Sequence, residues 1–144
     1  RAREGAALAR DLRRRLKALR GLRQRIDRRA RRAPADYREA LARRLARLGG
    51  QPVDPAILAR ELVVFADRTD VSEELTRLGS HLDQAETLIR GGEPAGRPLD
   101  FLCQELLREI NTVGSKANDA ELAGLVVAFK SQLEAIREQV QNIE

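Results

Sequence analysis

The stretch LARDLRRRLKALRGLRQRI, residues 8–26, decides the class of fold. Its apolar residues recur at steps of three and four, which is the spacing along one face of an α-helix, and arginines occupy most of the other faces. These apolar positions are Leu8, Leu12, Leu16, Leu19, Leu22 and Ile26. The pattern predicts a long amphipathic helix over residues 2–32.

Composition extends this prediction to the whole chain of 144 residues. Aromatic residues make up 3% of the chain, charged residues make up 34%, and there is no Trp or Met. Such usage is typical of long helices and coiled coils rather than of sheets. We therefore predict an all-α fold, in which long amphipathic helices form an extended helical bundle that is completed by oligomerisation.

Proline and glycine residues divide the remainder of the chain into further helices. Pro34 suits the first turn of a helix and not its interior, so we expect a second helix to begin there and to end at Gly49. This makes residues 1–48 a basic helical hairpin. The other predicted helices are 54–90, with a kink near Thr69, then 99–113, and a last one that is capped by Asn118 or Asp119.

The last predicted helix carries a narrow apolar seam. Its apolar residues alternate steps of four and three, which is the pattern of a coiled coil. They are Leu122, Val126, Phe129, Leu133, Ile136, Val140 and Ile143. Because so narrow a seam is buried best against another helix, we expect the protein to associate with itself.

Charge is distributed unevenly along the chain. Residues 1–48 hold 18 Arg or Lys against 5 Asp or Glu, whereas residues 49–144 hold 9 against 17, so the net charge of +5 is made up of +13 and −8. The basic part would attract a phosphate backbone, and the acidic part, helices 54–144, would contain the candidate active site. An arginine-rich helix is also simply well solvated, so charge alone leaves both interpretations open.

Two polar stripes carry the chemistry that the sequence offers. The first holds Asp70, Glu73, Glu74, Arg77 and His81, and the second holds Gln104, Glu105, Arg108 and Glu109. If the stripes faced each other, four carboxylates and one imidazole would converge, which suits a hard divalent cation. Exposed helices use the same spacing for weak ion pairs, and on spacing alone this second interpretation ranks first.

Several classes of function and location are excluded by what the sequence lacks. His81 is the only histidine, and the sequence offers no Ser-His-Asp arrangement around it. There is also no P-loop, dinucleotide-binding glycine pattern or zinc-finger spacing. No apolar run approaches the roughly 20 residues that span a bilayer. With one cysteine, Cys103, and no signal-peptide core, we expect a soluble, cytoplasmic protein. Because residue 1 is not Met, we expect an upstream domain to be missing.

Two long runs resemble the YicC-like endoribonuclease family. They are DRTDVSEELTRLGSHL, residues 67–82, and RPLDFLCQELLREINTVGSKANDAE, residues 97–121. The ending REQVQNIE, residues 137–144, and the opening RAREGAALARDL, residues 1–12, also fit the family. The likeness therefore covers essentially the whole chain. The resemblance implies a bacterial, cytoplasmic endoribonuclease that acts on RNA in its turnover, depends on a divalent metal, Mn²⁺ or Mg²⁺, and forms a homo-oligomer, a hexamer. It also implies that the N-terminal half of the protein is missing here. Leu107 stands where the family has Asn, and Arg68 where it has Lys.

The family motifs fall on the two polar stripes and suggest roles for their residues. Glu74, Glu105 and Glu109, with Asp70 or Glu73, would hold the metal ion at the scissile phosphate. His81 would act as general acid or base, and Arg108 or Arg77 would stabilise negative charge at phosphorus. The RNA backbone would be held by Arg13, Arg14, Arg20, Arg28 and Lys116.

Two other interpretations come from different classes of function. The chain can be a non-catalytic oligomerisation scaffold whose paired carboxylates are interface and surface features, with chemistry supplied by the missing half. It can also be an RNA-binding adaptor that binds in a salt-dependent way and does not cut. An active site should gather His81 and Glu105 in a cleft open to the basic helix, and a scaffold should not.

Overall fold

The computed structural model describes residues 2–92 and 96–143. Within these residues there are five helices and no strand, which confirms the predicted all-α fold. No helix of the described chain is long and apolar enough to cross a membrane. The helices are α1 (Ala2–Arg47), α2 (Pro55–Thr69), α3 (Ser72–Arg90), α4 (Gly96–Lys116) and α5 (Ala120–Val140).

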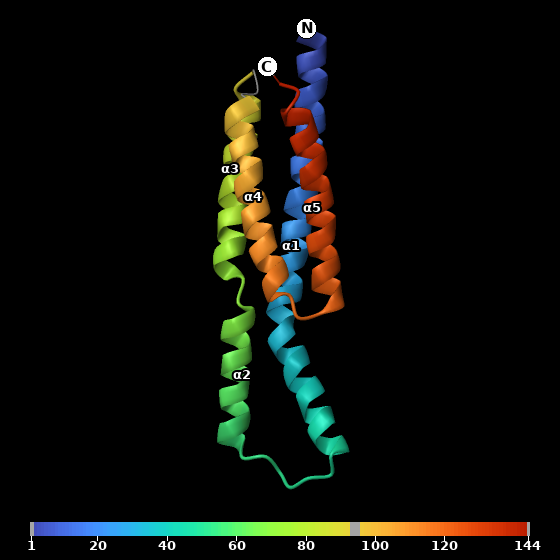
Figure 1. Ribbon diagram of the computed structural model, residues 1–144, viewed down its shortest axis with the longest axis vertical. Helices are drawn as coiled ribbons and strands as arrows, with labels where there is room; N and C mark the ends of the chain where they lie inside the picture. Colours follow the sequence, from blue (N-terminus) through green and yellow to red (C-terminus); the bar gives the residue numbers. More distant parts are fainter. Residues whose placement is uncertain (1, 93–95, 144) are drawn as a thin grey trace.

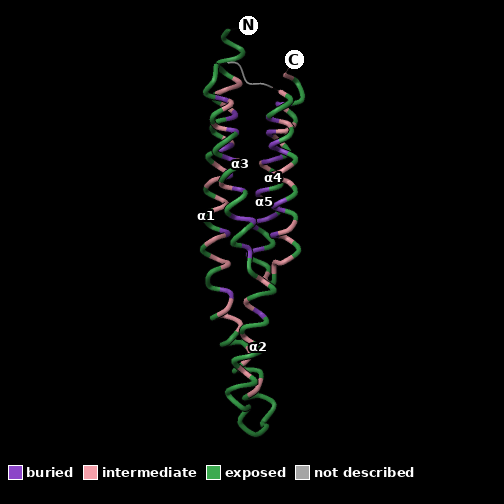
Figure 2. The backbone as a smooth tube through the Cα atoms, turned by 90° about the vertical axis from the view of Figure 1, so that its left-hand side faces the viewer, coloured by how far each residue is buried: buried purple, intermediate pink, exposed green. Residues whose placement is uncertain are grey.

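Four of the helices form an antiparallel bundle, and the fifth extends it (Figure 1). α1 packs against α3 and α5, and α4 packs against the same two helices from the other side. Figure 2 shows the result as two layers, α1 with α3 and α4 with α5. α2 continues the line of α3 beyond the bundle and packs against the C-terminal part of α1. α1 and α4 therefore lie on opposite corners of the bundle.

The core of the bundle is built from the apolar stripes that the sequence shows. In α1 the stripe from Leu12 to Ile26 is buried, and in α5 the predicted seam from Leu122 to Val140 is buried, with Ile143 packed against it. Because α1 and α4 of the same chain cover α5, self-association is not needed to bury this seam. The prediction of α5 itself is confirmed, and its cap is Asp119, which accepts a hydrogen bond from the Leu122 backbone N–H at 2.7 Å.

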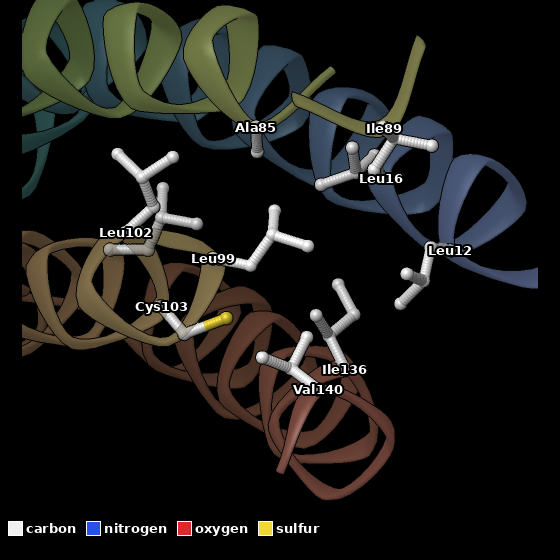
Figure 3. Close-up of a pocket in the computed structure, with 10 residues that line it drawn as sticks. Leu12, Leu16, Ala85, Ile89, Leu99, Leu102, Cys103, Ile136 and Val140 are labelled. Atoms are coloured by element: carbon white, nitrogen blue, oxygen red, sulfur yellow. The ribbon is translucent and has the colours of Figure 1, made fainter. Parts of the chain in front are cut away.

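The space enclosed by the described core at one end of the bundle is too small for a ligand. Figure 3 shows the end of the bundle near Ile89 and Val140, where the apolar side chains of α1, α3, α4 and α5 enclose a space of about 10 Å³. That is the lower limit for a single water molecule. The Cys103 thiol points into this space, and burial raises its pKa to about 11, so the thiol stays protonated and unreactive near neutral pH.

The predicted hairpin in residues 1–48 is wrong, because α1 is one helix of 46 residues with Pro34 in its interior. A proline there leaves the Ala30 carbonyl without its helical donor and destabilises the helix by about 3 kcal/mol. Contacts of the following turn offset part of this cost. Arg29 bridges the proline to reach Asp36 at 2.6 Å, and Tyr37 stacks on Phe65 of α2 with ring centroids 3.9 Å apart. In Figure 1 the C-terminal part of α1 slants away below the ends of α4 and α5.

The third predicted helix is divided in two, close to the kink expected near Thr69. Asp70 and Val71 separate α2 from α3, with Asp70 in an extended conformation. Local polar groups satisfy both helix ends: the Asp70 carboxylate accepts from the Ser72 backbone N–H at 2.9 Å, and the Thr69 hydroxyl donates to the Phe65 carbonyl. The fourth predicted helix is confirmed and is slightly longer than 99–113.

The pair formed by α2 and the C-terminal part of α1 leaves much apolar surface uncovered. Ile57 and Val63 of α2 are 63% and 60% exposed, and Leu48, which follows α1, is 74% exposed. Phe65 is the one buried residue of α2. The four-helix part has its own core. The predicted oligomerisation would therefore have apolar surface left to cover at this extension.

The Phe129 ring is fully buried at the centre of α5. Phe129→Ala should therefore lower the free energy of unfolding by about 3–5 kcal/mol, because a cavity replaces the ring. Val127→Ala, at a position 67% exposed on the same helix, should change it by less than about 0.5 kcal/mol. Urea denaturation followed by circular dichroism measures both. Equal losses in the two variants would show that α5 is not packed as described.

Candidate functional site

The two polar stripes lie on the sides of α3 and α4 that face each other, which is the first of the two alternatives that the sequence left open. Arg77 Nε donates to Glu109 Oε1 at 2.9 Å, and Lys116 Nζ donates to Glu74 Oε1 at 2.8 Å. Since the numbering rises along α3 where it falls along α4, these bonds confirm an antiparallel register. We refer to Arg77, His81, Glu105, Arg108 and Glu109 as the α3–α4 face.

This register brings His81 level with Glu105. His81 lies one turn after Arg77, and Glu105 lies one turn before Glu109. Because the two helices are antiparallel, both residues are displaced from the ion pair in the same direction by about 6 Å. Both side chains are partly exposed. His81 Nδ1 is buried and has no hydrogen-bond partner among the described residues.

Arg77 and Glu109 form the central ion pair of this face. The Glu109 side chain is only 8% exposed, and its hydrogen bond raises the pKa of Arg77, so the guanidinium stays charged at any pH of interest. Glu73 also approaches Arg77, at 3.5 Å, but is 85% exposed and contributes little. A buried carboxylate that is already paired in this way orients Arg77 and is not free to act as a base.

Asp70 and Glu74 are bound at the joint between α2 and α3. Lys116 Nζ donates both to Glu74 and to the Asp70 carbonyl, at 2.8 and 2.9 Å. Hydrogen bonds from the Ser72 hydroxyl and backbone N–H lower the pKa of Asp70. These groups therefore hold the end of α4 against the start of α3.

The expected metal ligands do not gather within one chain. In the described residues, no three His, Cys, Asp or Glu side chains lie close enough together to hold a metal ion. Three of the expected ligands, Asp70, Glu74 and Glu109, already bind neighbouring groups of the protein. The residues that one chain brings together thus do not fit the divalent cation that the resemblance implies.

The predicted RNA-binding residues have two different environments. Arg13 and Arg28 are exposed and form no ion pair in the described chain, whereas Arg14 is paired with Asp11. Arg20 is bound to Asp83 and Glu86 at 2.7 and 2.8 Å, and Lys116 is bound to Glu74. Sequence reasoning missed other exposed cations on the face of α1 that holds Arg13 and Arg28, although the helical period of 3.6 indicates them. They are Lys17, Arg25 and Arg32.

We call Arg13, Lys17, Arg25, Arg28 and Arg32 the basic face of α1. This face does not open onto the α3–α4 face. α1 reaches α3 through Arg23, which donates to the Leu75 carbonyl, and reaches α5 through Arg29, which binds Asp119. The side of α1 that remains exposed points away from α4. The cleft between His81 and the basic helix that an active site would need is therefore absent within a single described chain.

Comparisons with known proteins now identify the family. Residues 26–144 match the family described as "Endoribonuclease YicC-like, C-terminal". A protein of Clostridioides difficile (strain 630), named "Probable endoribonuclease YicC", is 41% identical over 146 residues, which cover 100% of this chain and 50% of the relative. A protein of the same name from Haemophilus influenzae is 41% identical over 92 residues, 64% of this chain and 32% of the relative.

The chain spans about half the length of the first of these relatives. The matches confirm the resemblance that was carried by residues 67–82 and 97–121. The chain belongs to the YicC-like endoribonuclease family, and it corresponds to the C-terminal region of that family.

Proposed function

We propose that this chain is the helical part of an endoribonuclease, and that RNA is cut at the α3–α4 face. The observation that carries the proposal is the antiparallel register that brings His81 level with Glu105, beside the Arg77–Glu109 ion pair. An imidazole and a carboxylate at one level can exchange protons with the two oxygens of a phosphodiester that reacts between them. The names of the relatives, probable endoribonucleases, agree with this class of reaction.

In the proposed reaction the side chains divide the work. One member of the His81–Glu105 pair takes the proton of the attacking hydroxyl as its oxygen bonds to phosphorus. The other gives a proton to the leaving oxygen as its bond to phosphorus breaks. The Arg77 guanidinium, oriented by Glu109, and the exposed Arg108 stabilise the negative charge that develops at phosphorus.

RNA is held, in this proposal, by the basic face of α1. Its cations are spread over 20 residues of helix, from Arg13 to Arg32, a length of about 28 Å. No exposed aromatic lies among them, so they contact phosphates and not bases. Because this face points away from α4, the RNA reaches the α3–α4 face by passing around the bundle or in a second copy of the oligomer that we expect.

A divalent cation remains a prediction from the family resemblance. It would need ligands beyond those that one described chain brings together, because Asp70, Glu74 and Glu109 are already bound. Cleavage measured after dialysis against EDTA, and again after addition of Mn²⁺ or Mg²⁺, decides this point. Full cleavage in EDTA would remove the metal from the proposal and leave the His81–Glu105 pair.

A scaffold is the second candidate function, and two observations favour it. Within a single described chain, no cleft joins His81 to the basic face of α1. The ion pairs Arg77–Glu109 and Lys116–Glu74 join α3 to α4, which is what a purely structural role would use them for. In that case the rest of the protein cuts the RNA. The substitutions below separate the two candidates, because a scaffold tolerates changes at partly exposed His81 and Glu105.

Replacing His81 by Ala, or Glu105 by Gln, should lower kcat for cleavage of a labelled structured RNA by about a hundredfold or more in the full-length protein. RNA affinity should stay nearly unchanged, because neither residue belongs to the basic face. Thr76→Ala and Glu134→Gln, exposed positions on α3 and α5, serve as controls and should retain full activity. Wild-type rates in both His81→Ala and Glu105→Gln would transfer the chemistry to another part of the protein.

Reversing three charges of the basic face, in Arg13→Glu/Lys17→Glu/Arg28→Glu, should weaken RNA binding at every sequence tested. The slope of log K against log salt concentration should fall by about 2–3, since each lost phosphate contact releases fewer counterions. The control triple Arg38→Glu/Arg43→Glu/Arg47→Glu makes the same change of charge at exposed positions beyond Pro34. Fluorescence anisotropy over a series of KCl concentrations measures both, and equal slopes for the two triples would refute a specific role for the basic face.

A further inference from the structure

A hollow of about 490 Å³ adjoins the α3–α4 face. It follows His81 and Glu105 along the same two helices: Gln84 comes three residues after His81, and Phe101 comes four residues before Glu105. In the antiparallel register both are displaced in the same direction, about one turn, or 5 to 6 Å, from the His81–Glu105 pair. Its lining residues are Asp83, Gln84, Thr87, Leu88, Pro98, Phe101 and Leu102.

The Phe101 ring lies in this hollow and is 59% exposed. The other aromatic rings of the described chain are covered: Phe65 and Phe129 are buried, and Tyr37 is stacked on Phe65. The residues near Phe101 on α4, in contrast, are buried in the core: Leu99, Leu102 and Cys103. An exposed ring beside a candidate active site is a typical feature of a ligand surface.

The chemistry of the lining suits a flat heterocycle. Phe101, Pro98 and Leu88 offer apolar contact, and the rim carries an amide, a hydroxyl and a carboxylate. The Thr87 hydroxyl donates to the Asp83 carbonyl, so its oxygen can accept a further hydrogen bond, and Gln84 Nε2 donates to Ser80, so the Gln84 carbonyl oxygen is left as an acceptor. Acceptors at the edge of an apolar surface match the amino groups of a nucleobase.

We propose that the hollow at Phe101 binds an unpaired nucleobase of the RNA, next to the phosphodiester that is cut. The base stacks on the Phe101 ring, and its edge faces Gln84 and Thr87. This proposal rests on the function proposed above, because it places the base one turn from His81 and Glu105. It gives the α3–α4 face the aromatic contact that the basic face of α1 lacks.

The proposal defines the class of substrate. A base inside a duplex has both faces covered by its neighbours, so only a base in a loop, a bulge or a single strand can lie on Phe101. Binding then selects cleavage sites by local strand structure, while the basic face holds the backbone without regard to sequence. Stacking on one ring is tolerant of base identity, and hydrogen bonds to the rim add at most a modest preference.

The test uses the full-length protein and an RNA with 2-aminopurine at the nucleotides that flank a mapped cleavage site. Binding is measured in a His81→Ala background, so that the RNA stays intact. Stacking on Phe101 should quench the 2-aminopurine fluorescence, and Phe101→Leu should abolish the quenching, because the leucine is apolar but has no ring. Phe101→Trp should retain the quenching.

With His81 intact, Phe101→Leu should raise KM by about tenfold on a single-stranded or bulged RNA, the loss expected for one base–aromatic contact, and Phe101→Trp should restore it. Val127→Leu, an exposed apolar position on α5, is the matched control and should change neither constant. A perfectly paired duplex should be a poor substrate for every variant.

Three results would overturn the proposal. The first is unchanged quenching and an unchanged KM in Phe101→Leu. The second is cleavage of the duplex as efficient as that of the single strand. The third is a changed oligomeric state of Phe101→Leu in sedimentation, which would mean that protein covers the hollow. Failure of the proposed function looks different, because His81→Ala would then cut RNA normally whatever the result at Phe101.

Discussion

The two ion pairs between α3 and α4 fix the register on which the candidate site depends. Glu74 and Glu109 are both nearly buried, so each needs its cation, and a slip of either helix would leave a carboxylate unpaired in the protein interior. The level position of His81 and Glu105, and the place of Phe101 one turn further on, follow from that register. The apolar core would tolerate several alignments of two leucine-rich helices, whereas the paired charges tolerate one.

Much of the fold follows from local pattern. The apolar faces of α1 and α5 and a cap at Asn118 or Asp119 could be predicted because helical periodicity and capping depend on residues close in sequence. The facing of the two polar stripes depends on how α3 and α4 pack, so the sequence offered it only as one of two alternatives. The continuity of α1 through Pro34 could not be predicted, since the contacts made by the turn that follows it, such as the Tyr37–Phe65 stack, join residues far apart in the chain. The seam of α5 predicted a partner helix correctly, but not that the partner belongs to the same chain.

The candidate site was predictable in outline and not in its electrostatics. Carboxylates at helical spacing identify a polar face, but they do not say which of them a cation from another helix will neutralise. Lys116, 42 residues away in sequence, binds Glu74, and Arg77 binds Glu109 across 32 residues, so the expected cluster of free carboxylates is divided. The exposed ring of Phe101 was equally hidden, because in the sequence it lies in an apolar run between buried neighbours.

Charge separation gives the molecule two sides. The basic face of α1 points away from α4, while exposed acidic side chains such as Glu73 and Asp83 lie near the α3–α4 face. Polyanionic RNA is drawn to the first side more strongly than to the second, where carboxylates and cations are mixed, so the approach to His81 depends on specific contacts more than on general attraction. An unpaired base on an apolar surface supplies a contact of that kind.

The most direct measurement is photo-cross-linking of an RNA that carries 4-thiouridine at a mapped cleavage site to the full-length Glu105→Gln variant, which should leave the RNA uncut, followed by mass spectrometry of the cross-linked peptides. Cleavage at the α3–α4 face requires cross-links in residues 77–84 and 101–109. Cross-links confined to the rest of the protein, outside this helical region, would mean that these helices hold or assemble the enzyme and do not cut.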